Sequence, residues 1–167
     1  MTLTHTLATD ILQQAKARVL ASSERMAHLL AFVPEEKLHW APSESSRSAI
    51  RLVAHCSTTN PFFAMLVTGK TPPAWPPMEE LMASMDAAER RFSTRKEVLE
   101  DLRRSTAELV AAIETVDESH LSEHVNSPFG PMPVSFWLTE AGQHLAVHAG
   151  QLAYLQTIWG DLDNHMG

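Results

Sequence analysis

Two histidines four residues apart, His144 and His148, lie in the apolar segment HLAVHAGQLAYLQTIWGD, which covers residues 144–161. In a helix this spacing places two side chains on one face, about 40° apart around the axis and about 6 Å apart along it. Neutral imidazole is the commonest metal ligand in proteins, and an open zinc-type site uses three protein ligands and leaves a fourth position for water or substrate. The pair could therefore chelate a metal ion together with one ligand from elsewhere in the chain.

The metalloprotease motif has the same histidine spacing, but it places a glutamate directly after the first histidine to act as general base. Leu145 occupies that position here, so the sequence excludes this chemistry. Glu140 stands one turn before His144 and could share its face. A carboxylate in the first turn of a helix is explained equally well by the helix dipole.

The third ligand must come from the remaining histidines, which are His5, His28, His39, His55, His120, His124 and His165. Only His55 stands well inside an apolar helical face, three residues after Leu52 and seven before Phe62. His120 and His124 are also four apart, but their surroundings are polar and indicate solvated side chains. Each of the three favoured histidines could instead be a core residue bonded to a carbonyl or hydroxyl. A shared metal ion, however, would satisfy three buried rings at once.

Two features near these histidines have simpler explanations. Cys56 is about 100° around the helix from His55, so the two side chains cannot easily bind one ion. It is interpreted as a small buried hydrophobic residue rather than a nucleophile or ligand. Gly142, Ala146 and Gly150 form a stripe of small residues on another side of the last helix, which predicts close helix packing within the chain or in a dimer.

Four long segments must position the histidines, and their apolar residues recur at helical spacing. We expect long helices at about 4–33, 47–67, 94–116 and 135–159, and a shorter one at 78–91. Thr94 and Glu97 have the spacing of a capping box at the start of one helix. Pro61 lies inside the second helix and should bend it.

Two proline-rich connections, GKTPPAWPPMEE and DESHLSEHVNSPFGPMPVS, separate the helices, and Trp75 in the first could close over a pocket. No alternation of useful length predicts a strand, and no internal repeat is visible. The sequence therefore predicts an all-α fold, a four-helix bundle with long proline-rich loops, formed as a single domain over residues 1–167.

Composition and charge limit the classes of function. Hydrophobic residues make up 44% of the chain, which is enough for a core, and the single cysteine favours a reducing compartment. The net charge of -7 disfavours binding to nucleic acid. The N-terminus lacks the pattern of a signal peptide, and no segment approaches the roughly 20 apolar residues of a membrane span. We expect a cytoplasmic protein that binds neither nucleic acid nor membrane.

Three motifs occur in a familiar order. In the last helix, His144 and His148 are followed by Gly-Gln and an apolar run that ends in Gly-Asp. Upstream, SAIRLVAHC ends just after His55, and SPFGPMP precedes the last helix. Together they resemble the motifs of the DinB-like (DinB/YfiT) superfamily over most of the chain. The resemblance implies an up-down-down-up bundle that binds a divalent metal ion, zinc or nickel, through His55, His144 and His148. Gln151 matches a glutamine that supports packing or orientation, and Ala149 replaces a residue that is often larger and polar in relatives.

Characterised relatives include metal-dependent transferases and isomerases that use low-molecular-weight thiols such as bacillithiol or mycothiol, and others resemble hydrolases. The resemblance therefore implies a divalent-metal-dependent enzyme with a three-histidine site, a thiol S-transferase or a related hydrolase. It also implies a small-molecule substrate, a low-molecular-weight thiol as partner, and a homodimer. The alternative is a non-catalytic, stress-related binding or assembly module, in which the histidines hold a structural metal ion or none.

Overall fold

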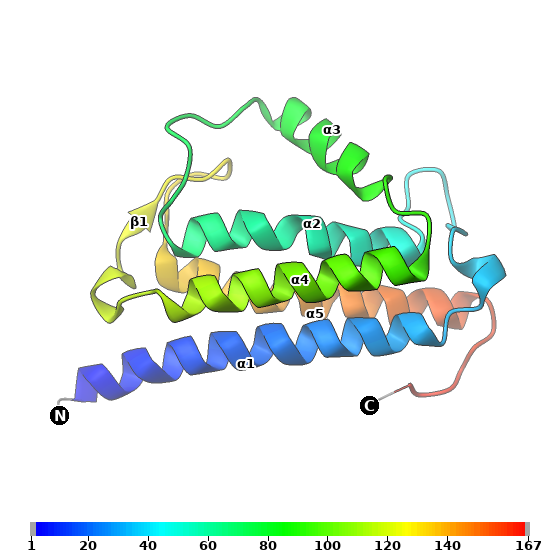
Figure 1. Ribbon diagram of the computed structural model, residues 1–167, viewed down its shortest axis with the longest axis horizontal. Helices are drawn as coiled ribbons and strands as arrows, with labels where there is room; N and C mark the ends of the chain where they lie inside the picture. The colour runs from blue at the N-terminus through cyan, green and yellow to red at the C-terminus, as the bar shows by residue number, and fades with distance from the viewer. Residues whose placement is uncertain (1–2, 166–167) are drawn as a thin grey trace.

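The computed structural model describes the backbone of residues 3–165 and the side chains of residues 10–165 (Figure 1). Its helices are α1 (Leu3–Ala31), α2 (Ala49–Val67), α3 (Met78–Glu89), α4 (Arg95–Glu114) and α5 (Val134–Ile158). Short 3-10 turns at Glu35–Lys37 and Glu118–His120 and two very short strands, β1 (His124–Val125) and β2 (Met132–Pro133), lie between them. The predicted all-α class and the predicted helices are confirmed, with ends that differ by one or two residues.

The four long helices α1, α2, α4 and α5 pack side by side. Figure 1 shows α1 and α5 running in one direction and α2 and α4 running in the opposite direction. The most extensive contacts join α2 to α4 and α1 to α5, and α2 also packs along α5. This last contact brings together the two helices that carry the three candidate histidines.

Apolar residues from all four long helices form the core. Fully buried members are Val19, Met26, Leu30, Leu66, Leu102, Leu109, Ile113, Leu138, Leu145 and Leu152. A polar network crosses this core: Ser23 Oγ lies 2.9 Å from Thr106 Oγ1, and Asn60 Nδ2 donates to Ser105 Oγ at 3.1 Å. Because a buried polar group without a partner is costly, these bonds favour one alignment of α1, α2 and α4.

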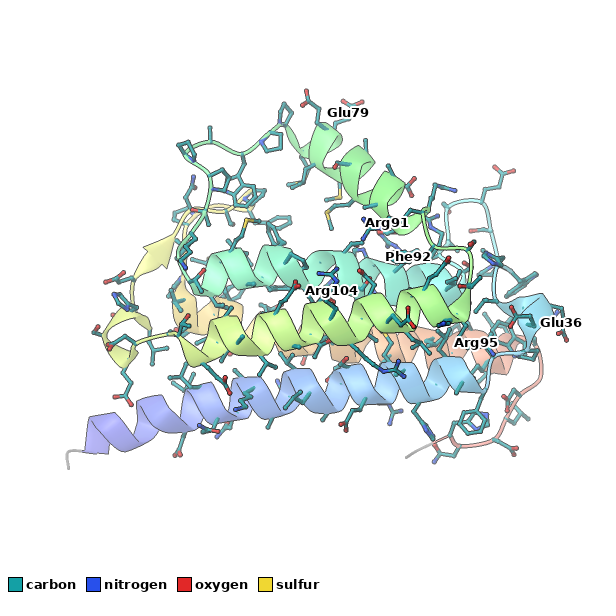
Figure 2. The ribbon with its side chains drawn as sticks, in the orientation of Figure 1. Glu36, Glu79, Arg91, Phe92, Arg95 and Arg104 are labelled. Atoms are coloured by element: carbon teal, nitrogen blue, oxygen red, sulfur yellow. The ribbon has the colours of Figure 1, made fainter. Side chains whose placement is uncertain are left out.

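The start of α4 is fixed by its cap and by a contact to the end of α1. Thr94 Oγ1 accepts from the backbone N–H of Glu97 at 3.3 Å, and Glu97 Oε2 accepts from the N–H of Thr94 at 3.1 Å. The predicted capping box is thus confirmed. Arg95 Nη2 donates to the carbonyl of Val33 at 2.5 Å and lies 3.3 Å from a carboxylate oxygen of Glu35, which ties α4 to the connection after α1 (Figure 2).

The connection before α5 contains structure that the sequence did not predict. Strands β1 and β2 pair antiparallel, with Val125 opposite Met132. The N–H of Val134 then donates to the carbonyl of Glu123 at 3.0 Å, and the N–H of Ser135 donates to that of Leu121 at 3.0 Å, so the connection is bonded to the first turn of α5. The sequence predicted a long proline-rich loop here and no strand, because strands of two residues are too short to show an alternating pattern.

Helix α3 lies outside the core. In Figure 1 it lies above α2, at an angle to the bundle, and Glu89 is its one buried residue among those that the structure describes. Trp75, in the connection before α3, donates from Nε1 to the carbonyl of Asn126 at 3.1 Å, and its ring lies 5.4 Å from that of Phe62. This connection is therefore attached both to the β1–β2 turn and to α2. Among the described residues, no helix is long and apolar enough to cross a membrane.

Candidate metal centre

The packing of α2 along α5 brings His55 next to His144 and His148. The Nε2 atom of His144 lies 3.1 Å from Nε2 of His55 and 3.2 Å from Nε2 of His148. The ligand atoms of the three rings all lie within 4.8 Å of one another, and they are the one such group of three or more potential ligands in the part of the chain that the structure describes. His55 is buried, and His144 and His148 are partly buried.

These spacings fit a metal ion held by imidazole. Tetrahedral zinc with Zn–N bonds of about 2.0–2.1 Å separates its ligand nitrogens by about 3.3 Å. The two measured Nε2–Nε2 distances, 3.1 and 3.2 Å, are close to this value. The three histidines are therefore placed so that they could hold one ion.

A carboxylate that the sequence analysis missed orients His55. Oε1 of Glu89, from α3, lies 2.7 Å from Nδ1 of His55 and can only accept from it. Such a bond to the outer nitrogen fixes the tautomer of a metal-binding imidazole and leaves Nε2 free for the ion. Its sequence neighbours Asp86, Arg90 and Arg91 suggest a solvated charged face, so nothing in the local pattern distinguishes Glu89.

Glu89 accepts hydrogen bonds from two arginines, Arg51 of α2 and Arg47 just before α2. Arg47 donates from Nε and Nη2 to the two carboxylate oxygens, both at 2.9 Å, and Arg51 Nη2 donates at 2.9 Å. Burial alone would raise the pKa of Glu89, but the hydrogen bonds from His55 and Arg47 and the charge of Arg47 outweigh it and lower the pKa to about 2. Glu89 is therefore an ionised acceptor and not a general base near neutral pH.

His148 is oriented in a similar way by Gln151, whose Oε1 lies 2.7 Å from Nδ1 of His148. With Nδ1 of both His55 and His148 donating, neutral rings present lone pairs at Nε2. A neutral His144 ring carries one proton, on Nδ1 or on Nε2. The three converging Nε2 atoms therefore hold at most one proton among them. Its Nδ1 is buried and has no partner among the described residues. A cation at the centre would satisfy lone pairs that otherwise face one another.

Burial keeps two of these rings neutral. Burial, together with the nearby rings of His148 and His55, lowers the pKa of His144 to about 3. Burial likewise lowers the pKa of His148 to about 4, although the bond to Gln151 acts in the opposite direction. Only the neutral form of imidazole binds metal, so both rings are in the binding form at neutral pH.

A cavity of about 490 Å³ opens next to the histidines and is lined by His55 and His144. Its walls come from α2, α3, α5 and the β1–β2 turn. Glu140 and Gln143, on the first half of α5, also line it, so Glu140 does share the face of His144 as the spacing suggested. A volume of this size is typical of small-molecule sites.

The sequence profile of the DinB superfamily matches residues 18–152, which include all three histidines. The chain belongs to the DinB superfamily.

Several solved structures share the fold of this chain. A mycothiol-dependent maleylpyruvate isomerase superposes with a TM-score of 0.70 at 19% identity, over 91% of this chain. This chain spans only 63% of the length of that isomerase. A DinB-like protein of Bacillus subtilis has a TM-score of 0.65 at 20% identity, with 90% of this chain and 94% of that one covered. A conserved protein of Enterococcus faecalis has a TM-score of 0.67 at 16% identity, with 95% and 97% covered. No curated protein sequence matches the chain.

The other histidines of this DinB-superfamily chain lie away from the centre. His120 and His124 are exposed, in agreement with their interpretation as solvated. His28 lies against the ring of Phe32, and His39 bonds to the backbone carbonyl of Ser93. His165 pairs with Asp161 near the C-terminus. The side chain of His5 lies outside the described residues.

The surroundings of Cys56 and of the small residues of α5 show what these residues contribute to packing. Cys56 is fully buried in the core, and burial raises the pKa of its thiol far above the ordinary value. Gly142 packs against Arg18 of α1, where an added Cβ would come within 2.6 Å of the Arg18 Cγ atom. Gly150, by contrast, faces open space. The small-residue stripe therefore serves packing within the chain at Gly142 and has no described contact at Gly150.

Proposed function

We propose that this chain is a divalent-metal-dependent enzyme that uses His55, His144 and His148 as ligands, a thiol S-transferase or a related hydrolase. One observation carries the proposal: three imidazole Nε2 atoms converge, and two of these rings, His55 and His144, line a cavity large enough for a small molecule. Structural zinc sites are closed by four protein ligands, whereas catalytic sites have three and leave a position open. The group of three beside a cavity fits the second kind.

The donor set favours zinc or nickel, since imidazole suits both ions. When bound, such an ion would lower the pKa of a thiol or water at the open position and so supply a nucleophile near neutral pH. The chain contributes the rest. Glu89 and Gln151 hold two of the rings in the binding tautomer, and the cavity beside His144 orients the electrophile and limits its contact with water.

Several observations favour an external thiol as the nucleophile. Cys56 is buried and its thiol pKa is raised, so the chain has no thiol of its own that could react. The mycothiol-dependent isomerase shares the bundle and supports the choice of a low-molecular-weight thiol. In an S-transfer the thiol sulfur bonds to an electrophilic carbon, the leaving group departs with the electron pair of its bond, and the thiol proton passes to solvent.

The metal part of the proposal is tested by elemental analysis of protein purified without an affinity tag. We expect about one zinc or nickel ion per chain after refilling, and little in His144→Ala or His148→Ala. His120→Ala removes an exposed histidine and serves as the matched control. A stoichiometry near zero in the refilled wild-type protein would remove the proposal.

The reaction is tested by incubating bacillithiol, mycothiol and simpler thiols with aromatic halide electrophiles and following the thioether product. The rate should fall on chelation and return when zinc or nickel is restored. The alternative, a binding or assembly module with a structural metal ion, gains if no thiol supports metal-dependent turnover. It gains further if His148→Ala lowers the melting temperature without altering any reaction.

A further inference from the structure

We propose that the cavity beside the three histidines binds an apolar, uncharged substrate and rejects anions, and that Glu140 sets this preference. The inference rests on the proposed function only in naming this ligand as the electrophile of the enzyme. Binding in the cavity depends on its walls and does not itself require a metal ion.

The walls of the cavity are mostly apolar and include aromatic and thioether side chains. The apolar lining residues are Phe62, Phe63, Leu81, Met82, Met85, Phe129, Met132, Phe136, Trp137 and Val147. Aromatic rings and flexible methionines adapt to apolar ligands of varied shape and contribute large contact areas. Burial of an apolar ligand against this surface is therefore favourable.

Charge decides what the cavity excludes. Among the side chains that the structure describes, no lysine or arginine lines it, and Glu140 is the one acidic residue on its wall. Glu140 has no hydrogen bond or ion pair with any residue that the structure describes, so its negative charge is not neutralised by a neighbour. The nearby cations Arg47 and Arg51 bond instead to Glu89. In the metal-free protein, an anionic ligand in the cavity would lose its hydration and lie near an unpaired carboxylate.

A neutral hydrogen-bond acceptor on the ligand has a candidate partner. Trp137 lines the cavity and is only 4% exposed, and its Nε1 has no partner among the described residues. A buried indole N–H usually donates to an acceptor. A carbonyl or ether oxygen on an otherwise apolar molecule would suit such a donor without adding charge.

The rim is also apolar and contains residues from three elements. Met82 of α3, Phe129 of the β1–β2 turn and Val147 of α5 line the cavity and are exposed. Exposed apolar residues that gather around a cavity mark a ligand site more often than isolated ones do. The rim thus extends the apolar surface outward from the histidines.

Two fluorescent probes with the same ring system test the inference. N-phenyl-1-naphthylamine is neutral, and 8-anilinonaphthalene-1-sulfonate adds a sulfonate to the same skeleton. In titrations of the chelator-treated wild-type protein, the neutral probe should bind at least about tenfold more tightly than the anionic one. Glu140→Gln should raise the affinity for the anionic probe several-fold and leave the affinity for the neutral probe nearly unchanged. Equal affinities in the wild-type protein would overturn the inference.

A pair of matched variants on α5 shows whether the probes bind in this cavity. Val147 and Ile158 are similarly exposed, at 47% and 45%, but only Val147 lines the cavity. Val147→Arg adds a cation at the rim and should favour the anionic probe, whereas Ile158→Arg should change neither affinity. The same response in both variants would place the binding elsewhere and overturn the inference. Melting curves of each variant show that the comparison is made on folded protein.

The titrations are made on metal-loaded and chelator-treated protein, so that this inference and the proposed function can fail separately. Selective binding of the neutral probe by a protein that holds no metal would remove the proposed function alone. Stoichiometric metal binding with no preference between the probes would remove this inference alone.

Discussion

The carboxylate of Glu89 lies 2.7 Å from Nδ1 of His55, so a helix outside the core orients a candidate metal ligand on a helix of the bundle. The same carboxylate accepts from Arg47 and Arg51, and all four side chains form one connected group between α3 and α2. The candidate metal centre therefore depends on α3 although none of its three histidines belongs to that helix.

Glu89→Gln should weaken metal binding by about 10- to 100-fold, because a neutral amide oxygen is a weaker acceptor for the Nδ1–H of His55 than a carboxylate and makes the ring a less basic ligand. Competition with a chromophoric chelator measures the affinity. Glu79→Gln is the matched control, since Glu79 lies at the outer end of the same helix (Figure 2) and is exposed. If both variants bind metal equally well, Glu89 has no role in orienting His55.

Metal binding should stabilise the folded protein, because the unfolded chain has no preformed site. Free metal at 100 times its dissociation constant would add about 2.7 kcal/mol to the free energy of unfolding. Thermal unfolding with and without zinc should show this as a higher melting temperature in the wild-type protein and in His120→Ala. His148→Ala should show little change, and a full shift in that variant would argue against His148 as a ligand.

The metal-free protein should lose stability as the pH falls below about 6.5, the ordinary histidine value. The pKa values of His144 and His148 are lowered to about 3 and about 4 in the folded state, so between pH 4 and 6.5 the unfolded chain binds more protons. Protonation therefore favours unfolding across this window. Urea midpoints at pH 7 and pH 5 measure the effect, and the double variant His144→Ala/His148→Ala should reduce it. If the difference between the midpoints at pH 7 and pH 5 is as large in the double variant as in the wild-type protein, other groups cause the loss of stability.

Loss of the metal ion in acid has the same origin, since protons compete with it for the imidazoles. The lowered pKa values of His144 and His148 mean that this competition begins at a lower pH than for free imidazole. Metal occupancy followed by dialysis at stepwise lower pH should fall gradually in mildly acidic buffer. Loss of half of the metal ion already at about pH 6.5 would show that these rings titrate like free histidine and would contradict the lowered pKa values.

Two glycines of α5 offer a matched pair for stability. Gly150→Ala should raise the free energy of unfolding by up to about 1 kcal/mol, because alanine is the better helix former and its methyl group would meet open space. Gly142→Ala should gain less or lose stability, because the stem of Arg18 must shift to make room. Urea titrations measure both. A loss on Gly150→Ala would show that another molecule, such as the second chain of a homodimer, packs against this face.

Much of the fold was predictable because the long helices have clear apolar periodicity and a capping box at Thr94. His55 was distinguishable for the same reason, since a polar ring inside an apolar stripe needs an explanation. Glu89 was not, because its burial comes from the way α3 lies over α2, and no local pattern encodes that contact. The partner of Trp75 was equally hidden: it donates to the backbone of Asn126, which any residue could offer.

Helix α3 combines two tasks within 12 residues. Near its end, Glu89 supports the centre, and one to two turns earlier Leu81, Met82 and Met85 line the cavity. Because these three residues lie outside the core, they can be exchanged without disturbing the packing of the bundle. Evolution could therefore redirect such a protein to a new substrate by altering one short surface helix while the bundle and its histidines stay as they are.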